Sequence, residues 1–286
     1  MSLNSVNTNM GAMVALQSLE STASQLSATQ KQISTGYRVA DSTDDGAAYA
    51  IAQGIRSTVG ALTSANQQLG NATGLMSTTQ SGLNSVSNMM SSMRNTLIKL
   101  GDSSVQGAQR ADYAQTYGTQ LKAVQAAIQD ASYNGKTLIG NITGSSGSFG
   151  RVAVVRNENA ASYGVATFSG SGLYSAISIT STLMASTTGA ASIAALITAG
   201  GTFLTQQQSV GTALNAIGSS INFVNNQTTY NNNKINSLNS GLGSLIDADL
   251  AKESAQHTAL QIRQQLGTQA LSMANQAPQT LLSLFK

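Results

Sequence analysis

Residues 55–100, IRSTVGALTSANQQLGNATGLMSTTQSGLNSVSNMMSSMRNTLIKL, decide the fold. Mostly apolar side chains recur here in steps of four and three, with one extra step of three between Met76 and Thr79. This spacing is typical of a coiled-coil seam, and the extra step is a stammer. At a rise of about 1.5 Å per residue, such a helix would be about 70 Å long. The seam members are Ile55, Val59, Leu62, Asn66, Leu69, Thr73, Met76, Thr79, Leu83, Val86, Met90, Met93, Leu97 and Leu100.

A second seam lies near the other end of the chain and has no slip. It consists of Phe203, Gln207, Val210, Leu214, Ile217, Ile221, Val224, Thr228, Asn231, Ile235, Leu238, Leu242 and Leu245. Because the two seams nearly match in length and the chain must return from one to the other, we expect an antiparallel pair, supported by a third helix around residues 113–128. Polar seam members such as Asn66 and Asn231 weaken the pair but can fix its register. The sequence therefore predicts a mainly α fold of long, coiled-coil-like helices.

The segments before and between the predicted long helices have their own patterns. The segment Asp41-Ser42-Thr43-Asp44-Asp45 precedes the first long helix, where hydroxyls and carboxylates can cap free amides. Between the seams, residues 151–156 and 163–169 are short β-like runs joined through residues 157–159, which predicts a small β-hairpin. Residues 171–201 are rich in Ser, Thr, Ala and Gly, and their pattern is ambiguous, although part of the segment could begin the returning helix.

Both ends of the chain carry apolar stripes with few charges. The N-terminal stripe is Leu3, Val6, Met10, Met13, Leu16, Leu19, Ala23, Leu26 and Ile33. The C-terminal one is Ala255, Ala259, Ile262, Leu266, Ala270, Met273 and Ala277, while Leu260, Leu271 and Leu282 recur every eleven residues, a period that keeps one face on a partner. A two-helix pair cannot hide all of these side chains, so the stripes predict further partners.

Composition excludes several function classes. Charged residues make up only 9% of the 286 residues, against about 25% in a typical domain. The 14 basic and 11 acidic residues are scattered, so nucleic-acid binding is disfavoured, and the absence of Cys rules out disulfides. Residues 264–285 are uncharged but too rich in Gln and too interrupted to insert into a membrane. Residues 1–21 do not have the regions of a cleavable signal peptide.

Catalytic and metal chemistry are not indicated. His257 is the only histidine, and Glu253 lies one helical turn before it, but no further ligand is in sight. No nucleophile, base and orienting group occur in a recognisable pattern. We therefore expect no enzyme activity, no metal and no cofactor.

Both ends together resemble one known family. LNSVNTN, QLSATQKQISTGYRVADSTDDGAAYAIAQGIRS and DADLAKESAQHTALQIRQQLGTQALSMANQAPQTLLSLFK are similar to the terminal regions of bacterial flagellins. The resemblance covers about residues 1–140 and 200–286. Gly36, Arg38, Asp44, Asp45 and Ala47 fall on the family's "TG-R...DD-A" pattern. Asn275, Gln276, Pro278, Leu282, Leu284 and the terminal basic residue, Lys286, fall on its "ANQ-PQ-LLSL" ending.

The resemblance implies an architecture. Terminal helices, residues 1–40 and 250–286, would pair as an inner tube of a filament, and residues 41–249 would form a helical rod with a β-hairpin and a short variable segment around 141–200. Subunit-assembly contacts would involve Leu3, Val6, Met10, Met13, Arg38, Leu266, Met273, Leu281, Leu282, Leu284 and Phe285. The rod seam would rest on Leu62, Leu83, Met90, Leu97, Leu214, Ile221, Ile235 and Leu238.

It also implies a function. A flagellin is exported through the flagellar channel and polymerises outside the cell into the filament that drives swimming. Expected partners are other copies, other flagellins, an export chaperone, and the junction and cap proteins of the filament. Two alternatives are a hook-filament junction protein, against which the complete C-terminal match argues, and a surface binding protein that borrows the fold. Ser92 and Asn95 stand where flagellins sensed by an innate immune receptor usually carry Arg and Glu.

Overall fold

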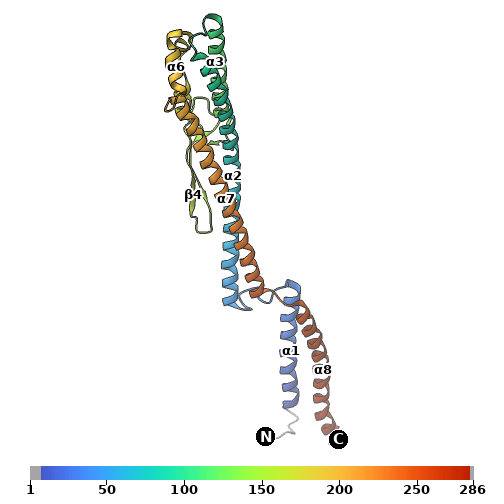
Figure 1. Ribbon diagram of the computed structural model, residues 1–286. Coiled ribbons are helices and arrows are strands. Elements are labelled where there is room, and N and C mark those ends of the chain that lie inside the picture. Colours follow the sequence, from blue (N-terminus) through green and yellow to red (C-terminus); the bar gives the residue numbers. More distant parts are fainter. Residues whose placement is uncertain (1–7, 284–286) are drawn as a thin grey trace. The chain divides into compact units, whose positions relative to one another are not determined.

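The structure, a computed structural model, describes residues 8–283, with side chains described up to Gln276 (Figure 1). It divides into two compact units, unit 1 (residues 1–59 and 236–286) and unit 2 (residues 60–235). The helices are α1 (Met10–Thr35), α2 (Gly46–Leu100), α3 (Gly107–Asp130), α4 (Gly170–Ile177), α5 (Ser181–Ala185), the 3-10 turn η1 (Thr187–Gly189), α6 (Ala190–Ile197), α7 (Thr202–Ile246) and α8 (Leu250–Ser283). The strands are β1 (Lys136–Thr137), β2 (Ser148–Phe149), β3 (Val152–Val155) and β4 (Ser162–Val165).

The rod of unit 2 is an antiparallel pair of α2 and α7, with α3 packed beside them. Asn66 of α2 donates to Asn232 of α7, and Gln207 of α7 donates to Ser91 of α2. Later positions of α2 therefore lie beside earlier positions of α7. One cluster of buried side chains runs through all three helices. The antiparallel long-helix architecture predicted from the two seams is therefore confirmed.

The two seams are shielded to different degrees. On α2, every seam member from Met76 to Leu100 is buried. On α7, every seventh residue from Phe203 to Asn231 is buried, whereas the other seam members are half-buried. The buried set is Phe203, Val210, Ile217, Val224 and Asn231. Thus α2 is the central helix of the rod, and α7 covers one side of it.

Local chemistry sets the helix ends around the long seams. The Asp45 carboxylate accepts from the amides of Ala47 and Ala48, and α2 starts at Gly46 as the Asp-rich segment predicted. Gly36 ends α1 in the left-handed region with φ of 74°, where it donates to the Gln32 carbonyl. This conformation is comfortable for glycine, which explains the Thr-Gly pair at that place.

A salt-bridge staple holds the segment between α1 and α2. The Lys31 ammonium lies 2.7 Å from Asp41 and 2.8 Å from Asp44. Hydrogen bonding to Lys31 is the main cause that lowers the pKa of both carboxyls, and the same bonds raise the pKa of Lys31. All three groups are accessible to solvent, so the staple adds little stability but fixes the local geometry.

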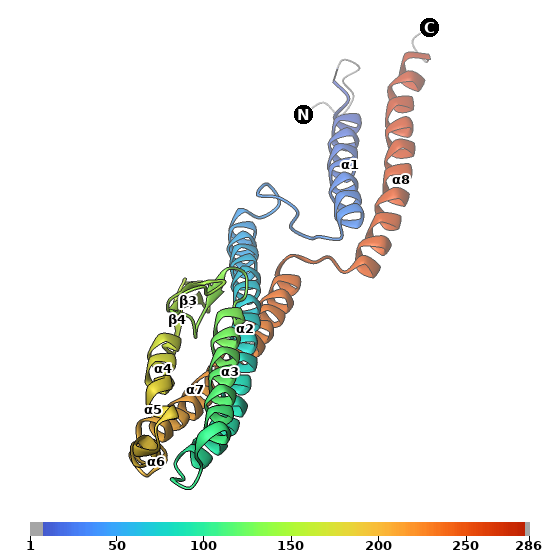
Figure 2. The same ribbon diagram turned by 90° about the horizontal axis from the view of Figure 1, so that it is seen from above.

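The predicted hairpin is present as β3 paired antiparallel with β4, with Val152 opposite Val165 and Val155 opposite Ser162. It lies beside α2 (Figure 2). The Tyr163 ring stacks on Phe223 with ring centroids 4.3 Å apart, and its hydroxyl lies 3.0 Å from Ser220 Oγ. These contacts attach the hairpin to α7.

Residues 171–201 contain more helix than the sequence indicated. Instead of an early start of the returning helix, the segment folds into α4, α5, η1 and α6, and α7 begins only at Thr202. Leu173, Ile177, Met184 and Ile193 are buried there. Long-range packing therefore orders a segment whose small, hydroxyl-rich residues have no strong local preference.

Two polar side chains organise this end of unit 2. Arg110 is 1% exposed and donates to the carbonyl of Met184 at 2.8 Å. Tyr117 donates to the carbonyl of Ile177 at 2.6 Å, and its burial raises the pKa of the phenol. Both bonds join α3 to the segment that follows the hairpin.

One described segment, Thr187–Ile246, is long and apolar enough to cross a membrane by length and composition, a test that core helices of soluble proteins also pass. Its apolar side chains include the buried seam of α7. In this structure they contribute to the rod core.

Candidate functional site

The terminal helices α1 and α8 pack side by side as an antiparallel pair (Figure 1). Asn9 at one end of α1 donates to the carbonyl of Ala274 at 2.7 Å. Near the middle, the Leu19 Cδ1 atom lies 3.3 Å from where a Cβ on Gly267 would be. Because Gly267 has no side chain, the Leu19 side chain can pack closely against α8 at this position.

The shielded side of each helix follows a strict heptad. On α1 it consists of Ala12, Ala15, Leu19, Thr22, Leu26, Thr29 and Ile33. On α8 it consists of Glu253, His257, Leu260, Gln264, Gly267, Leu271 and Ala274. Nearly half of these residues are polar or are glycine. The seam between α1 and α8 is therefore less apolar than the rod seam.

The pair buries little apolar surface. Among the described side chains of α1, only Thr22 and Thr29 are buried, and among those of α8 only Leu260 is. The apolar core of unit 1 lies elsewhere, where Val39, Ala48, Ala52 and Ile246 cluster. Within the described part of the chain, α1 and α8 are thus a helix pair without a continuous apolar core.

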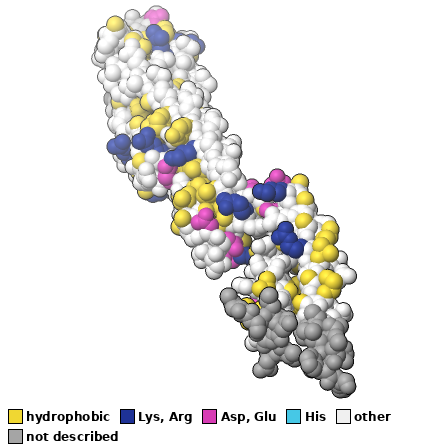
Figure 3. All heavy atoms as spheres, turned by 90° about the horizontal axis from the view of Figure 1, so that it is seen from below, with side chains coloured by type: hydrophobic (Ala, Val, Ile, Leu, Met, Phe, Trp, Pro, Cys, Tyr) yellow, Lys and Arg dark blue, Asp and Glu magenta, His cyan; other side chains and the backbone are white. Residues whose placement is uncertain are grey.

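Many other large apolar side chains of this unit point to solvent. Of the thirteen large hydrophobic residues that the structure describes as exposed, ten belong to unit 1. They include Met10 (63% exposed), Met13 (60%), Ile262 (54%), Leu266 (61%) and Met273 (61%). Hydrophobic side chains are visible on this unit in Figure 3, next to the part that is not described.

The apolar stripe read from the sequence of α8 lies on this outer face. Ala255, Ala259, Ile262, Leu266, Ala270 and Met273 are all exposed. The eleven-residue series behaves differently, because Leu260 and Leu271 lie on the side that faces α1. We name the exposed set Met10, Met13, Val14, Ile262, Leu266 and Met273 the outer apolar face. Large apolar side chains exposed together on one helix pair are typical of protein interaction surfaces.

Most of the remaining candidate assembly residues lie outside the part of the chain whose side chains the structure describes. Leu3, Val6, Leu284 and Phe285 lie outside the described residues, and Leu281 and Leu282 lie in α8 beyond the last described side chain. Arg38 is exposed, and its guanidinium donates to the carbonyl of Leu245. Among the candidate seam residues, Leu62, Leu83, Met90 and Leu97 are buried, whereas Leu214, Ile221, Ile235 and Leu238 are half-buried.

A paired-linker clamp, residues 36–39 with 245–248, was not visible in the sequence. The amides of Arg38 and Val39 donate to the carbonyl of Ile246, and the amide of Ala248 donates to that of Gly36. Backbone pairing between two short linkers leaves no hydrophobic period. The only signal was Arg38 itself, whose side chain closes the clamp.

The terminal pair presents apolar and uncharged polar side chains. No group of three or more potential metal-ligating side chains occurs among the described residues. Glu253 and His257 are half-buried in the α1–α8 seam. The polar residues of the pair are mainly uncharged Gln, Asn, Ser and Thr, which can be desolvated at lower cost than charges.

Comparisons with known proteins match both helical parts of the chain. Residues 6–143 match the family model of the bacterial flagellin N-terminal helical region, and residues 197–285 match that of the C-terminal helical region. Flagellin FljK of Caulobacter vibrioides is 30% identical over 286 residues, covering 100% of both chains. A flagellin of Brucella melitensis is 32% identical over 302 residues, covering 99% of each. A solved structure described as a flagellar hook-associated protein from Vibrio parahaemolyticus aligns with a TM-score of 0.40 and 15% identity, covering 78% of this chain and 99% of that one, which supports no assignment.

Proposed function

The chain belongs to the bacterial flagellin family, and on that premise we propose that its outer apolar face is the surface through which neighbouring copies assemble. Flagellins are structural proteins and not enzymes, and this chain is an exported subunit that polymerises into the extracellular flagellar filament for motility. It thus associates with itself and with hook-associated proteins.

The single observation that carries the proposal is the orientation of the α8 stripe. Ile262, Leu266 and Met273 face away from α1 and are more than half exposed. Removing such side chains from water contributes about 25 cal/mol per Å² of apolar surface, and full burial of one contributes about 1.5–3 kcal/mol. A neighbouring copy gains this free energy at every site along a polymer, whereas a monomer does not.

We further propose the division of labour in the filament. Residues 1–40 and 250–286 form its inner core, and residues 41–249 form the rod outside it, with the hairpin and the short variable segment around 141–200. The support is the contrast in packing: α2 and α7 bury their seams within one chain, whereas α1 and α8 leave apolar side chains uncovered. In the core we assign contacts to Leu3, Val6, Leu281, Leu282, Leu284 and Phe285 as well.

More specific partners follow from the same exposed surface. A chain with an uncovered apolar face must be shielded before export, which an export chaperone would do. Cap and junction proteins would cover that face at the two ends of the filament. Other flagellins with similar terminal helices could copolymerise with this chain.

The test is assembly of a matched pair of variants. Met273→Asp places a charge on the outer apolar face, and Met273→Leu keeps the position apolar at similar volume. Electron microscopy of seeded, purified protein should show long filaments for wild type and Met273→Leu, and none for Met273→Asp. Long filaments from Met273→Asp would remove the outer apolar face from the assembly contacts, and short rings from wild type would indicate a junction protein.

A further inference from the structure

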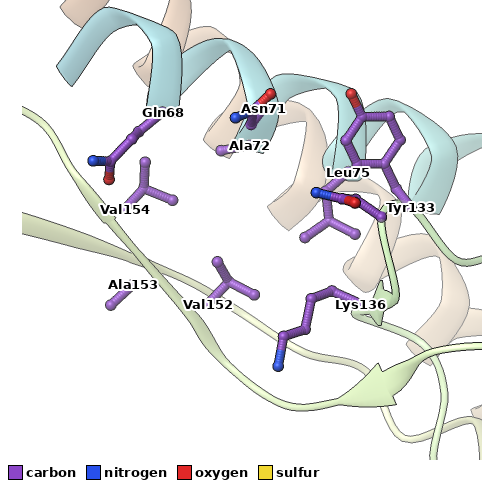
Figure 4. A pocket seen from close by; sticks show the side chains of 10 residues that line it. Gln68, Asn71, Ala72, Leu75, Tyr133, Lys136, Val152, Ala153 and Val154 are labelled. Carbon is purple, nitrogen blue, oxygen red and sulfur yellow. The ribbon is translucent and has the colours of Figure 1, made fainter. Parts of the chain in front are cut away.

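An open groove runs along unit 2 between α2 and strand β3. Ala72, Leu75, Val152 and Val154 form its apolar floor, with Gln68 and Asn71 on the α2 side (Figure 4). Tyr133 and Lys136 flank the end near Val152. The groove is thus apolar inside and has a cation at its rim.

The surroundings of the groove carry uncompensated positive charge. Lys136 and Arg151 are exposed, and Arg156 follows the far end of β3. The hairpin's own carboxylate, Glu158, is paired with Lys234. None of the ion pairs among the described residues involves Lys136, Arg151 or Arg156. Figure 3 shows Lys and Arg side chains gathered on this part of the rod. A fitting ligand would therefore combine apolar surface with carboxylates.

A segment of unit 1 has this chemistry. In Asp247-Ala248-Asp249-Leu250, both carboxylates are exposed and Leu250 is 49% exposed. Asp247 and Asp249 take part in none of the ion pairs of the described residues, and nearby Arg38 is engaged with the Leu245 carbonyl. We name residues 247–250 the acidic corner.

We propose that the groove beside β3 receives the acidic corner of a second copy of the chain, with Leu250 over the apolar floor and Asp247 near Lys136. Charge complementarity argues for this occupant: unit 2 carries eight Lys and Arg against four Asp and Glu, whereas unit 1 carries six against seven. The inference rests on the assembly function and adds a contact outside the terminal helices.

The geometry of such a contact suits a polymer. The groove and the acidic corner are different surfaces of the same chain, so each copy that offers its corner still has a free groove. Heterologous contacts of this kind extend into open helical assemblies unless the rotation closes a ring. The contact would therefore add to filament growth without competing with the outer apolar face.

The first test is zero-length cross-linking of wild-type filaments assembled from an equal mixture of unlabelled and ¹⁵N-labelled chains. A carbodiimide joins an amine and a carboxylate only when they are in contact. Mass spectrometry should find a Lys136–Asp247 or Lys136–Asp249 link with mixed isotopes, which can arise only between copies. Filaments that give other cross-links but neither of these would overturn the proposed contact.

The second test is a charge swap. Lys136→Glu and Asp247→Lys should each raise the critical concentration for assembly by about threefold to tenfold, because each faces like charge. Both substitutions in one chain should restore it to within about twofold. Asp249 is left unchanged because it caps α8 through the amides of Ala251 and Lys252.

The matched control is Lys122→Glu, the same charge change at an exposed position of α3. It should assemble like wild type. If Lys136→Glu behaves like this control, or if the double variant is no better than the singles, the groove is not the site. Wild-type chains that form no filaments at all would overturn the assembly function itself, and this contact with it.

Discussion

The rod pair α2–α7 and the terminal pair α1–α8 use the same heptad spacing with opposite results. In the rod, the apolar residues are the seam, and Leu62, Leu83 and Leu97 are at most 1% exposed. In the terminal pair, the seam alternates leucines such as Leu19 and Leu260 with Thr, Gln and Gly, and other large apolar residues, such as Leu266, face outward. The comparison shows that the heptad period predicts which residues share one face of a helix. It does not predict which face packs against the partner helix within the chain. The rod helices find their partner within the chain, and we propose that the terminal helices find theirs in other copies.

The largest effect is expected from a charge in the rod seam. Leu83→Asp buries a carboxylate where Leu83 is 1% exposed, which costs at least several kcal/mol unless the group is protonated. Thermal unfolding followed by circular dichroism should lose its cooperative transition. Asn84→Asp, the same new carboxylate at the exposed neighbouring position, should melt like wild type. Equal melting of the two variants would show that the seam is not the core of the rod.

The polar layer in the rod should contribute less. Asn231 is fully buried, and its amide donates to Asn66 Oδ1 at 2.8 Å and to the Arg156 carbonyl at 3.0 Å. Asn231→Ala leaves these acceptors without a donor and should lower the free energy of unfolding by about 1–3 kcal/mol. Urea titration measures it, with Asn225→Ala at an exposed position of the same helix as the control. A loss no greater than that of the control would mean that solvent replaces Asn231.

The same Leu-to-Asp change on the outer apolar face should hardly affect the monomer. Leu266 is 61% exposed, so Leu266→Asp should change the free energy of unfolding by no more than about 0.5 kcal/mol. Polymerisation should nevertheless be lost, because the carboxylate would be buried between copies. Paired calorimetry and seeded assembly separate the two effects. A destabilised monomer would mean that α8 is packed within the chain more tightly than its exposure indicates.

The smallest effect concerns the Lys31 staple. The pKa values of Asp41 and Asp44 are lowered from 3.8, so their contribution is present above that value and is lost as the pH falls through the folded pKa values. The pKa of Lys31 is raised, so its contribution is lost as the pH rises through its folded value, above 10.5. In Lys31→Met, NMR titration should find both aspartates titrating closer to 3.8. Unchanged midpoints would contradict the pairing.

The sequence was sufficient for the long helices and the hairpin. Seams of 4-3 spacing identified α2 and α7, Asp45 marked the start of α2, and alternation around residues 157–159 located β3 and β4. It was insufficient for α4 to α6, because Ser, Thr, Ala and Gly have weak preferences and the helices there depend on burying residues such as Ile177 and Met184.

The site was predictable in part. The apolar stripes of α1 and α8 could be read directly, but not which stripe faces the partner helix within the chain. Hydrophobic ranking would place Leu266 in that seam, yet Gly267 lies there because its missing side chain admits Leu19. The paired-linker clamp was invisible because backbone hydrogen bonds between Arg38, Val39 and Ile246 do not depend on a side-chain pattern.

Hydrogen exchange on monomer and filament is the most direct test of the difference between the two helix pairs. In the monomer, amides in residues 62–100 and 203–231 should be strongly protected, and those in residues 10–35 and 250–276 should exchange much faster, because few apolar side chains are buried there. In the filament, both sets should be protected. Terminal helices that are as protected as the rod in the monomer would contradict the claim that neighbouring copies complete their packing.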